Sequence, residues 1–108
     1  MFRPLDTFRA TLLSRLKPGD TALRVTASSA RYLDRMDVGD HTYFVLGNHE
    51  IVRYTHEEPY DEREDPLLLE VVRDVTAVGR VSLPAGSCLR YQWVAPAFTD
   101  YFTQLDAA

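Results

Sequence analysis

Cysteine is nearly absent from this chain, since Cys88 is the only one among 108 residues. One thiol cannot form an internal disulfide, and it rules out zinc sites built from several cysteines. Long apolar runs are absent too: the longest is Tyr43–Leu46, whereas a membrane-spanning helix needs about 20 apolar residues. The N-terminal residues contain no apolar stretch of the kind that marks a secretory signal. We therefore expect neither a membrane segment nor a secreted scaffold held by disulfides.

Positive charge is in short supply as well, and lysine occurs once, at Lys17. Twelve basic residues against sixteen acidic ones give a net charge of −4 at pH 7. A protein that binds nucleic acid through its phosphates needs the opposite balance, so no nucleic-acid partner is expected. The chain also lacks a phosphate-binding glycine loop, a Gly-x-Ser-x-Gly nucleophile turn and a His-Glu-x-x-His zinc motif. These absences favour a protein that is not an enzyme and that has no cofactor.

The residues that are present predict a single domain over residues 1–108. A chain of this length has no room for two separate cores, and its hydrophobic share of 45% can support one folded core. Residues 1–7 contain Pro4 and show no period, which indicates an extended N-terminal arm. A β module over residues 8–94 and a C-terminal aromatic segment over residues 95–108 follow.

Two alternating runs open the β module. Phe8–Leu13 partly alternates and Thr21–Thr26 alternates cleanly, with Leu23 and Val25 expected to point inward. Between them, Lys17-Pro18-Gly19-Asp20 has proline and glycine at the positions that a type II turn requires. The two runs are therefore predicted to form a hairpin.

A short helix and a second hairpin are expected next. Ala27–Met36 has apolar residues three apart and is followed by Gly39, which is typical of a short amphipathic helix and its end. His41–Leu46 and His49–Thr55 are rich in aromatic and β-branched residues. Gly47-Asn48 between them predicts a two-residue hairpin loop, because both residues tolerate a positive φ.

The second half of the chain alternates loops with regular elements. His56–Pro66 has seven charged residues and is predicted to be a solvated loop, which could bind a cation or steer a basic neighbour. The nearly continuous apolar start of Leu67–Val75 predicts a strand buried on both faces or of ambiguous register. The remaining expectations are a turn at Pro84-Ala85-Gly86, a strand over Cys88–Val94 and a helix from Pro96 through Leu105.

These signals together predict a mainly β fold. It is a small antiparallel β-barrel or sandwich of about six strands, with a short internal helix and a possible C-terminal helix. Cys88 is interpreted as a structural thiol, because it has no local helix N-terminus that would make it reactive.

One short motif resembles a known catalytic block. Leu46-Gly47-Asn48-His49-Glu50 is similar to a signature of the calcineurin-like metallophosphoesterases, which bind two metal ions. The chain has only three histidines, His41, His49 and His56, and these cannot complete two metal shells. A single metal held by His41, His56 and Glu57 is geometrically possible. We expect no metal site, and a metal-dependent hydrolase is the least favoured function.

A longer pattern resembles small β modules in virion proteins of tailed bacteriophages, which occur in tail, hub and fibre-attachment components. It includes Gly-Asp-Thr-x-Leu-x-Val after the first turn and Pro-Ala-Gly-Ser before the last strand. The stretches that carry it, within residues 17–94, are Pro18–Val25, Gly39–Leu46, Glu50–Thr55 and Val71–Leu89.

The resemblance implies a structural protein of a tailed phage or prophage particle, assembled in the host cytoplasm into the virion. It implies a homo-oligomer in the tail or an adaptor for fibres or the baseplate, whose partners are copies of itself and other tail, fibre or portal-proximal virion proteins. A capsid-decorating protein is the nearest alternative. A β-barrel that binds a small ligand or peptide is a further one, with a pocket expected near Tyr43, Tyr54, Tyr91 or Trp93.

Residues that could join neighbouring copies lie at both ends of the chain and at Arg73. Phe98, Tyr101 and Phe102 have helical spacing and indicate core or interface packing rather than a cofactor site. Arg73 is expected to cross to a neighbouring strand or subunit and bind carboxylate or carbonyl oxygens. The full set of interface candidates is Phe2, Arg3, Leu5, Phe8, Arg73, Phe98, Tyr101 and Phe102.

Overall fold

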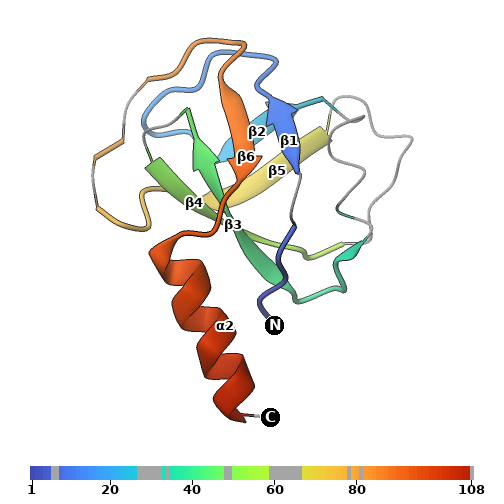
Figure 1. Cartoon of the computed structure of the whole chain (residues 1–108). Coiled ribbons are helices and arrows are strands. Elements are labelled where there is room, and N and C mark those ends of the chain that lie inside the picture. The colour runs from blue at the N-terminus through green and yellow to red at the C-terminus, as the bar shows by residue number, and fades with distance from the viewer. Residues whose placement is uncertain are drawn as a thin grey trace.

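The computed structural model of this chain is a curled antiparallel half-barrel with one C-terminal helix (Figure 1). It describes residues 1–5, 8–26, 33, 35–47, 50–58, 67–77, 79–80 and 82–107. The strands are β1 (Arg9–Thr11), β2 (Ala22–Val25), β3 (His41–Leu46), β4 (Glu50–Thr55), β5 (Leu67–Val72) and β6 (Cys88–Tyr91), and the helix is α2 (Ala95–Ala107). The mainly β fold with a C-terminal helix that the sequence predicts is thus confirmed.

The strands form one sheet in the order β1-β6-β3-β4-β5-β2, with every neighbour antiparallel. The edge strands β1 and β2 meet at a single antiparallel bridge between Leu12 and Val25, and the Leu13 N–H donates to the Arg24 carbonyl at 2.8 Å. The sheet therefore curls until its two edges touch, and its concave face encloses the core.

The predicted hairpin between the first two strands is wrong. β1 pairs with β6 and β2 pairs with β5, because β1 and β2 are opposite edges that meet only where the sheet closes. The turn between them does form, since the Asp20 N–H donates to the Lys17 carbonyl at 3.0 Å. Gly19 does not have a positive φ, so the type II assignment is wrong. The Asp20 carboxylate accepts from the Lys17 N–H at 2.9 Å and stabilises the turn instead.

The β3–β4 hairpin is confirmed, but its loop is longer than predicted. The last paired residues are Leu46 and Glu50, so three residues separate them rather than two. Gly47 has a φ of +62° and donates its N–H to the Cys88 carbonyl of β6 at 2.8 Å. Gly47, which the sequence assigns to the two-residue turn, thus also bonds to the third strand, β6. Asn48 and His49 lie outside the described residues.

β5 ends at Val72 and is buried on one face only, contrary to the expectation for Leu67–Val75. Leu69 and Val71 point into the core, whereas the side chains of Leu68 and Val72 are 59% and 61% exposed. An antiparallel sheet that curls around a core covers only its inner face. β6 is likewise shorter than expected and ends at Tyr91.

Two expectations fall largely outside the described part of the chain. Most of the internal helix predicted for Ala27–Met36 is not described, although Leu33 and Met36 at its end are buried in the core as their spacing predicts. Residues 59–66 of the acidic loop are not described either.

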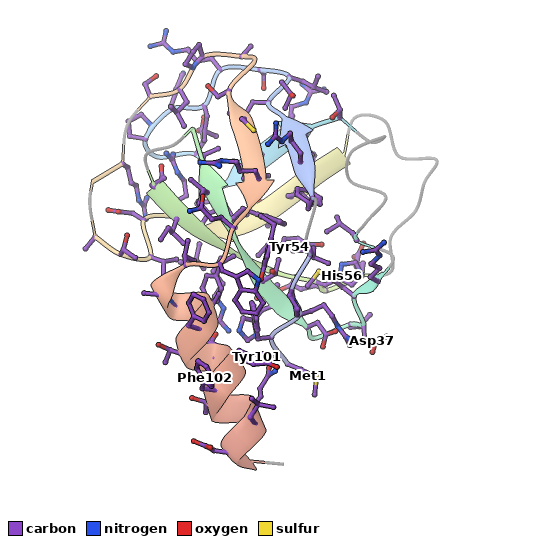
Figure 2. The ribbon with its side chains drawn as sticks, in the orientation of Figure 1. Met1, Asp37, Tyr54, His56, Tyr101 and Phe102 are labelled. Carbon is purple, nitrogen blue, oxygen red and sulfur yellow. The ribbon has the colours of Figure 1, made fainter. Side chains whose placement is uncertain are left out.

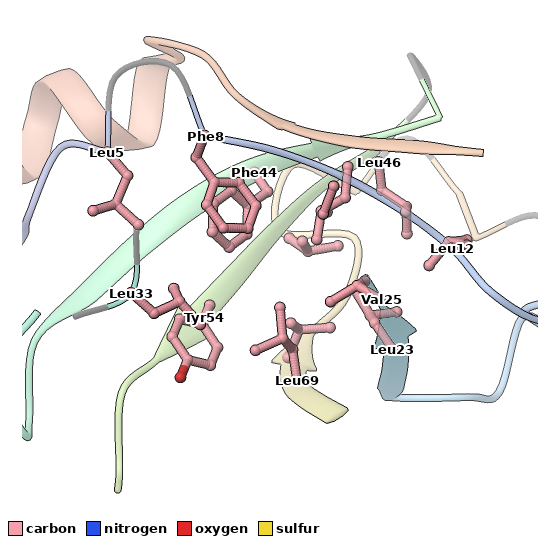
Figure 3. Packing of buried hydrophobic residues seen from close by; sticks show 14 of the residues in the cluster. Leu5, Phe8, Leu12, Leu23, Val25, Leu33, Phe44, Leu46, Tyr54 and Leu69 are labelled. Atoms are coloured by element: carbon pink, nitrogen blue, oxygen red, sulfur yellow. The ribbon is translucent and has the colours of Figure 1, made fainter. Parts of the chain in front are cut away.

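Two apolar clusters hold the fold together. The larger one fills the half-barrel and includes Phe8 stacked on Phe44, with ring centroids 4.5 Å apart (Figure 3). The smaller one, built on Phe2, Tyr43 and Ala97, lies between β3 and α2. Within the described residues, no helix is long and apolar enough to cross a membrane. The smaller cluster therefore fixes the position of α2 against β3.

Candidate assembly surface on the C-terminal helix

α2 begins where the sequence predicts a helix, with Pro96 in its first turn. Proline suits this place because the N–H groups of the first turn have no partner inside the helix. The first turn closes when the Phe98 N–H donates to the Val94 carbonyl at 3.1 Å. One side of the helix, made of Ala97, Asp100 and Gln104, faces the rest of the protein, and the Ala97 side chain is fully buried.

Asp100 binds α2 to β3. One of its carboxylate oxygens lies 2.6 Å from His41 Nε2 and accepts a hydrogen bond from the Tyr43 hydroxyl at 2.6 Å. Burial by itself would raise the pKa of the Asp100 carboxyl, but the hydrogen bonds from Tyr43 and His41 outweigh it and lower the pKa. Burial, together with Asp100, raises the pKa of Tyr43 to about 12. The phenol therefore stays protonated and serves as a donor that holds the helix.

Gln104 makes a second link, to the N-terminal arm. Its side-chain oxygen accepts from the Phe2 N–H, and its amide nitrogen donates to the Phe2 carbonyl at 3.3 Å. The arm in turn pairs with the start of β3: Phe2 forms a parallel bridge with His41, and the Arg3 N–H donates to the His41 carbonyl at 2.8 Å. The arm is thus paired beside the start of β3, and α2 has two polar attachments, one to β3 and one to the arm.

The outer side of α2 is apolar and exposed. Phe98, Tyr101, Phe102 and Leu105 are 46%, 36%, 56% and 53% exposed. They are four of the nine large hydrophobic side chains exposed among the described residues, within a helix of 13 residues. Figure 2 shows Tyr101 and Phe102 on the helix below the strands. We call these four residues the aromatic face.

The rings of this face contact one another and Trp93, which lies in the segment between β6 and α2. Phe98 stacks on Trp93 with centroids 5.1 Å apart, and Tyr101 meets the same indole edge-on at 5.7 Å. Phe98 and Phe102 are 6.4 Å apart and nearly parallel. Ring contacts of this kind limit side-chain motion, so the aromatic face is held in a defined shape.

The other interface candidates make contacts within their own chain. Phe2, Leu5 and Phe8 are buried in the two clusters, and Arg3 binds the Asp40 carboxylate at 3.2 Å. Of the candidates, only Phe98, Tyr101 and Phe102 are brought together on an exposed surface. The N-terminal arm contacts its own chain, where the sequence led us to expect contacts with a neighbouring copy.

Arg73 crosses to a neighbouring strand of its own chain. Its guanidinium forms a fully buried ion pair with Glu50 and donates to the carbonyls of Lys17 at 2.6 Å and Asp20 at 3.2 Å. The sequence predicts carboxylate or carbonyl partners for Arg73, but it did not identify Glu50 as the carboxylate. The available signal was the alternation along β4, which puts Glu50 on the same inward face as Val52. A carboxylate buried on that face needs a cation opposite it.

The histidines do not form a shared site in the described residues. His41 binds Asp100, whereas His56 Nδ1 lies 2.8 Å from the Tyr54 hydroxyl, and no group of three metal-ligating side chains occurs in the described ranges. The aromatics proposed for a ligand pocket are also divided. Tyr54 belongs to the barrel core, whereas Tyr43 and Trp93 belong to the cluster under α2.

The comparisons with known proteins assign no role to the aromatic face. Neither a protein-family model nor a curated protein matches this chain.

Proposed function

We propose that this chain is a structural protein of a tailed-phage or prophage particle. It assembles as a homo-oligomer in the tail, or as an adaptor for fibres or the baseplate, and contacts its neighbours through the aromatic face of α2. The single observation that supports this proposal is the exposure of four large apolar side chains on one helix. The motifs in residues 17–94 that resemble phage β modules connect the assembly role to a phage particle.

Physical chemistry favours an interface on this surface. Burying a Phe or Leu side chain contributes roughly 1.5–3 kcal/mol, and the aromatic face leaves about half of that unrealised for each side chain. Aromatic residues are enriched in the buried centres of protein interfaces. Because Asp100 and Gln104 hold α2 against β3 and the arm, the surface is already ordered before it meets a partner. A preformed surface loses less entropy on binding.

The proposal is tested by molar mass in solution. Light scattering after size-exclusion chromatography should show association that rises with protein concentration up to about 1 mM. The double variant Phe98→Ser/Phe102→Ser should remain monomeric. The matched control is Leu68→Ser/Val72→Ser, which removes similar exposed apolar area from β5 and should associate like the unmodified protein.

Two outcomes would contradict the proposal. A strict monomer at all concentrations would exclude assembly through α2. A gene neighbourhood without capsid, portal or tail genes would exclude the phage particle even if the chain associates.

A further inference from the structure

We propose that α2 pairs with α2 of a second copy in antiparallel orientation, about a two-fold axis beside Tyr101 and Phe102. This inference rests on the proposed function, because it specifies the partner and geometry of the assembly surface. The occupant of the aromatic face is thus the same face on another molecule.

The spacing of the aromatic face fits a helix partner. Phe98, Tyr101, Phe102 and Leu105 follow each other at i, i+3, i+4 and i+7, which places them along one stripe of the helix. Stripes with this spacing are what two packed helices bury against each other. The side that binds β3 and the arm is a different one, made of Ala97, Asp100 and Gln104.

The stripe is complementary to itself when a second helix runs the other way. A two-fold axis beside the midpoint of Tyr101 and Phe102 puts Phe98 opposite Leu105 of the second copy. The same axis puts Tyr101 opposite Phe102 of the second copy. Each apolar side chain then faces another apolar one, as a two-fold interface requires.

Charge selects the antiparallel orientation over the parallel one. The last turn of α2 contains Asp106 and no basic residue, and the first turn contains no acidic residue. A carboxylate at a helix C-terminus is unfavourable, because that end of the helix dipole is negative. In the antiparallel pair Asp106 lies level with Ala97, at the positive end of the second helix. In a parallel pair both Asp106 side chains would instead lie level with the negative C-terminal ends of both helices.

The exposed area limits the strength of the contact. Aromatic side chains bury about 150–250 Å² each, and those of the aromatic face are about half exposed. The four side chains offer roughly 350 Å² per copy, so the pair buries roughly 700 Å², below the roughly 1,200 Å² of stable interfaces. The isolated pair is therefore weak, and many copies held in one particle would strengthen it through effective concentration.

Disulfide trapping tests the orientation. All variants have Cys88→Ser, because Cys88 is a partly exposed thiol. Phe98→Cys and Leu105→Cys proteins are mixed in equal amounts, oxidised mildly and analysed by intact mass. We expect the mixed disulfide to exceed each homodimer several-fold. Thr103→Cys, on an exposed side of the helix away from the aromatic face, should cross-link far more slowly than either variant in the mixture.

Asp106→Lys separates the pairing from the stability of the single helix. A lysine suits the C-terminus of its own helix but faces the positive N-terminus of the second copy. We expect thermal stability to be unchanged or higher, and dimer dissociation to become about threefold to tenfold easier. Unchanged or tighter association would overturn the antiparallel pair.

The results distinguish this inference from the proposed function. Predominant Phe98→Cys homodimers, or Thr103→Cys cross-linking at an equal rate, would overturn the antiparallel pair. In that case, loss of association in Phe98→Ser/Phe102→Ser would still support assembly through α2. The aromatic face would then bind a groove on another protein or another surface of this chain. A strict monomer at every concentration would overturn both.

Discussion

The Arg73–Glu50 pair is the most completely buried ionic contact among the described residues. Neither side chain is exposed, and Glu50 also accepts the Asp74 N–H at 2.9 Å. The pair joins β4, the end of β5 and the turn at Lys17 and Asp20, which are far apart in the sequence. A buried charge without its partner is strongly unfavourable, so each member of the pair requires the other.

Arg73→Met is expected to lower the free energy of unfolding by about 3–5 kcal/mol, because it leaves the Glu50 carboxylate buried and uncompensated. Urea unfolding followed by tryptophan fluorescence measures this change. The double variant Arg73→Met/Glu50→Leu should recover much of the loss. Arg24→Met, at an exposed position of β2, should change the free energy by less than about 0.5 kcal/mol. Equal effects of Arg73→Met and Arg24→Met would contradict this account.

Tyr43 reports directly on the contact between α2 and β3. Its pKa of about 12 predicts that the Tyr43 phenol ionises well above the usual pH of 10, visible by ultraviolet absorbance. Tyr43→Phe should remove this late step. Asp100→Ala should move it to lower pH, because the nearby carboxylate disfavours phenolate. Because the folded protein holds the proton more tightly than the unfolded chain, this contribution to stability is lost as the pH rises above 10. No late step in the unmodified protein would refute the contact.

The β3–β4 loop shows how a neighbouring element restricts a turn. At Gly47, with its φ of +62°, an added Cβ would lie 2.9 Å from Leu83 Cδ2. Glycine at position 47 therefore allows both a left-handed backbone and a close contact with Leu83 in the segment before β6.

Gly47→Ala is expected to destabilise the protein by about 2 kcal/mol, from left-handed backbone strain and overpacking against Leu83. Thermal unfolding would measure it. In a Leu83→Ala background the same substitution should cost clearly less, because the crowded methyl groups are gone. An unchanged cost in that background would leave backbone strain as the whole effect and contradict the packing argument.

Alternation along the chain was a good guide to which face of each strand is buried. Leu23 and Val25 point inward as predicted, and so do the members of the Phe8–Leu13 run with the same period. The same reasoning failed for Leu67–Val75, because an apolar residue on the outer face looks identical in sequence to a buried one. Leu68 and Val72 are outside only because nothing in the described residues covers that face of β5.

Both ends of the chain meet at β3 in the molecule as a whole. The arm pairs with the start of β3, and α2 binds the same strand through Asp100. Nearby, the His56 side chain is buried beside Tyr54, and the backbone N–H of His56 donates to the Asp40 backbone carbonyl at 2.8 Å. Burial lowers the pKa of this imidazole, and the carboxylates of Asp40 and Asp37 offset only part of that effect. Folding therefore favours neutral His56.

The free energy of unfolding should fall as the pH is lowered through 6.5, the ordinary pKa of histidine. Below that pH the unfolded chain binds a proton at this residue more readily than the folded protein does, so acid favours unfolding. Urea unfolding at about pH 7.5 and about pH 5.5 measures the difference. His56→Gln should show a smaller loss than the unmodified protein. An equal loss in both would assign the pH dependence to other groups.

The sequence by itself determined the strand-rich character of the fold, most element positions and the C-terminal helix with its aromatic spacing. These depend on local period, turn residues and a proline in a first helical turn, all of which act within a few residues. Tertiary structure alone decided that β1 pairs with β6, that Arg73 meets Glu50 and that Asp100 binds β3. It also decided that Phe2 and Leu5 of the arm are buried while the aromatic face is exposed. Such contacts join residues far apart in the chain, and their energy comes from burial that exists only once the sheet has curled.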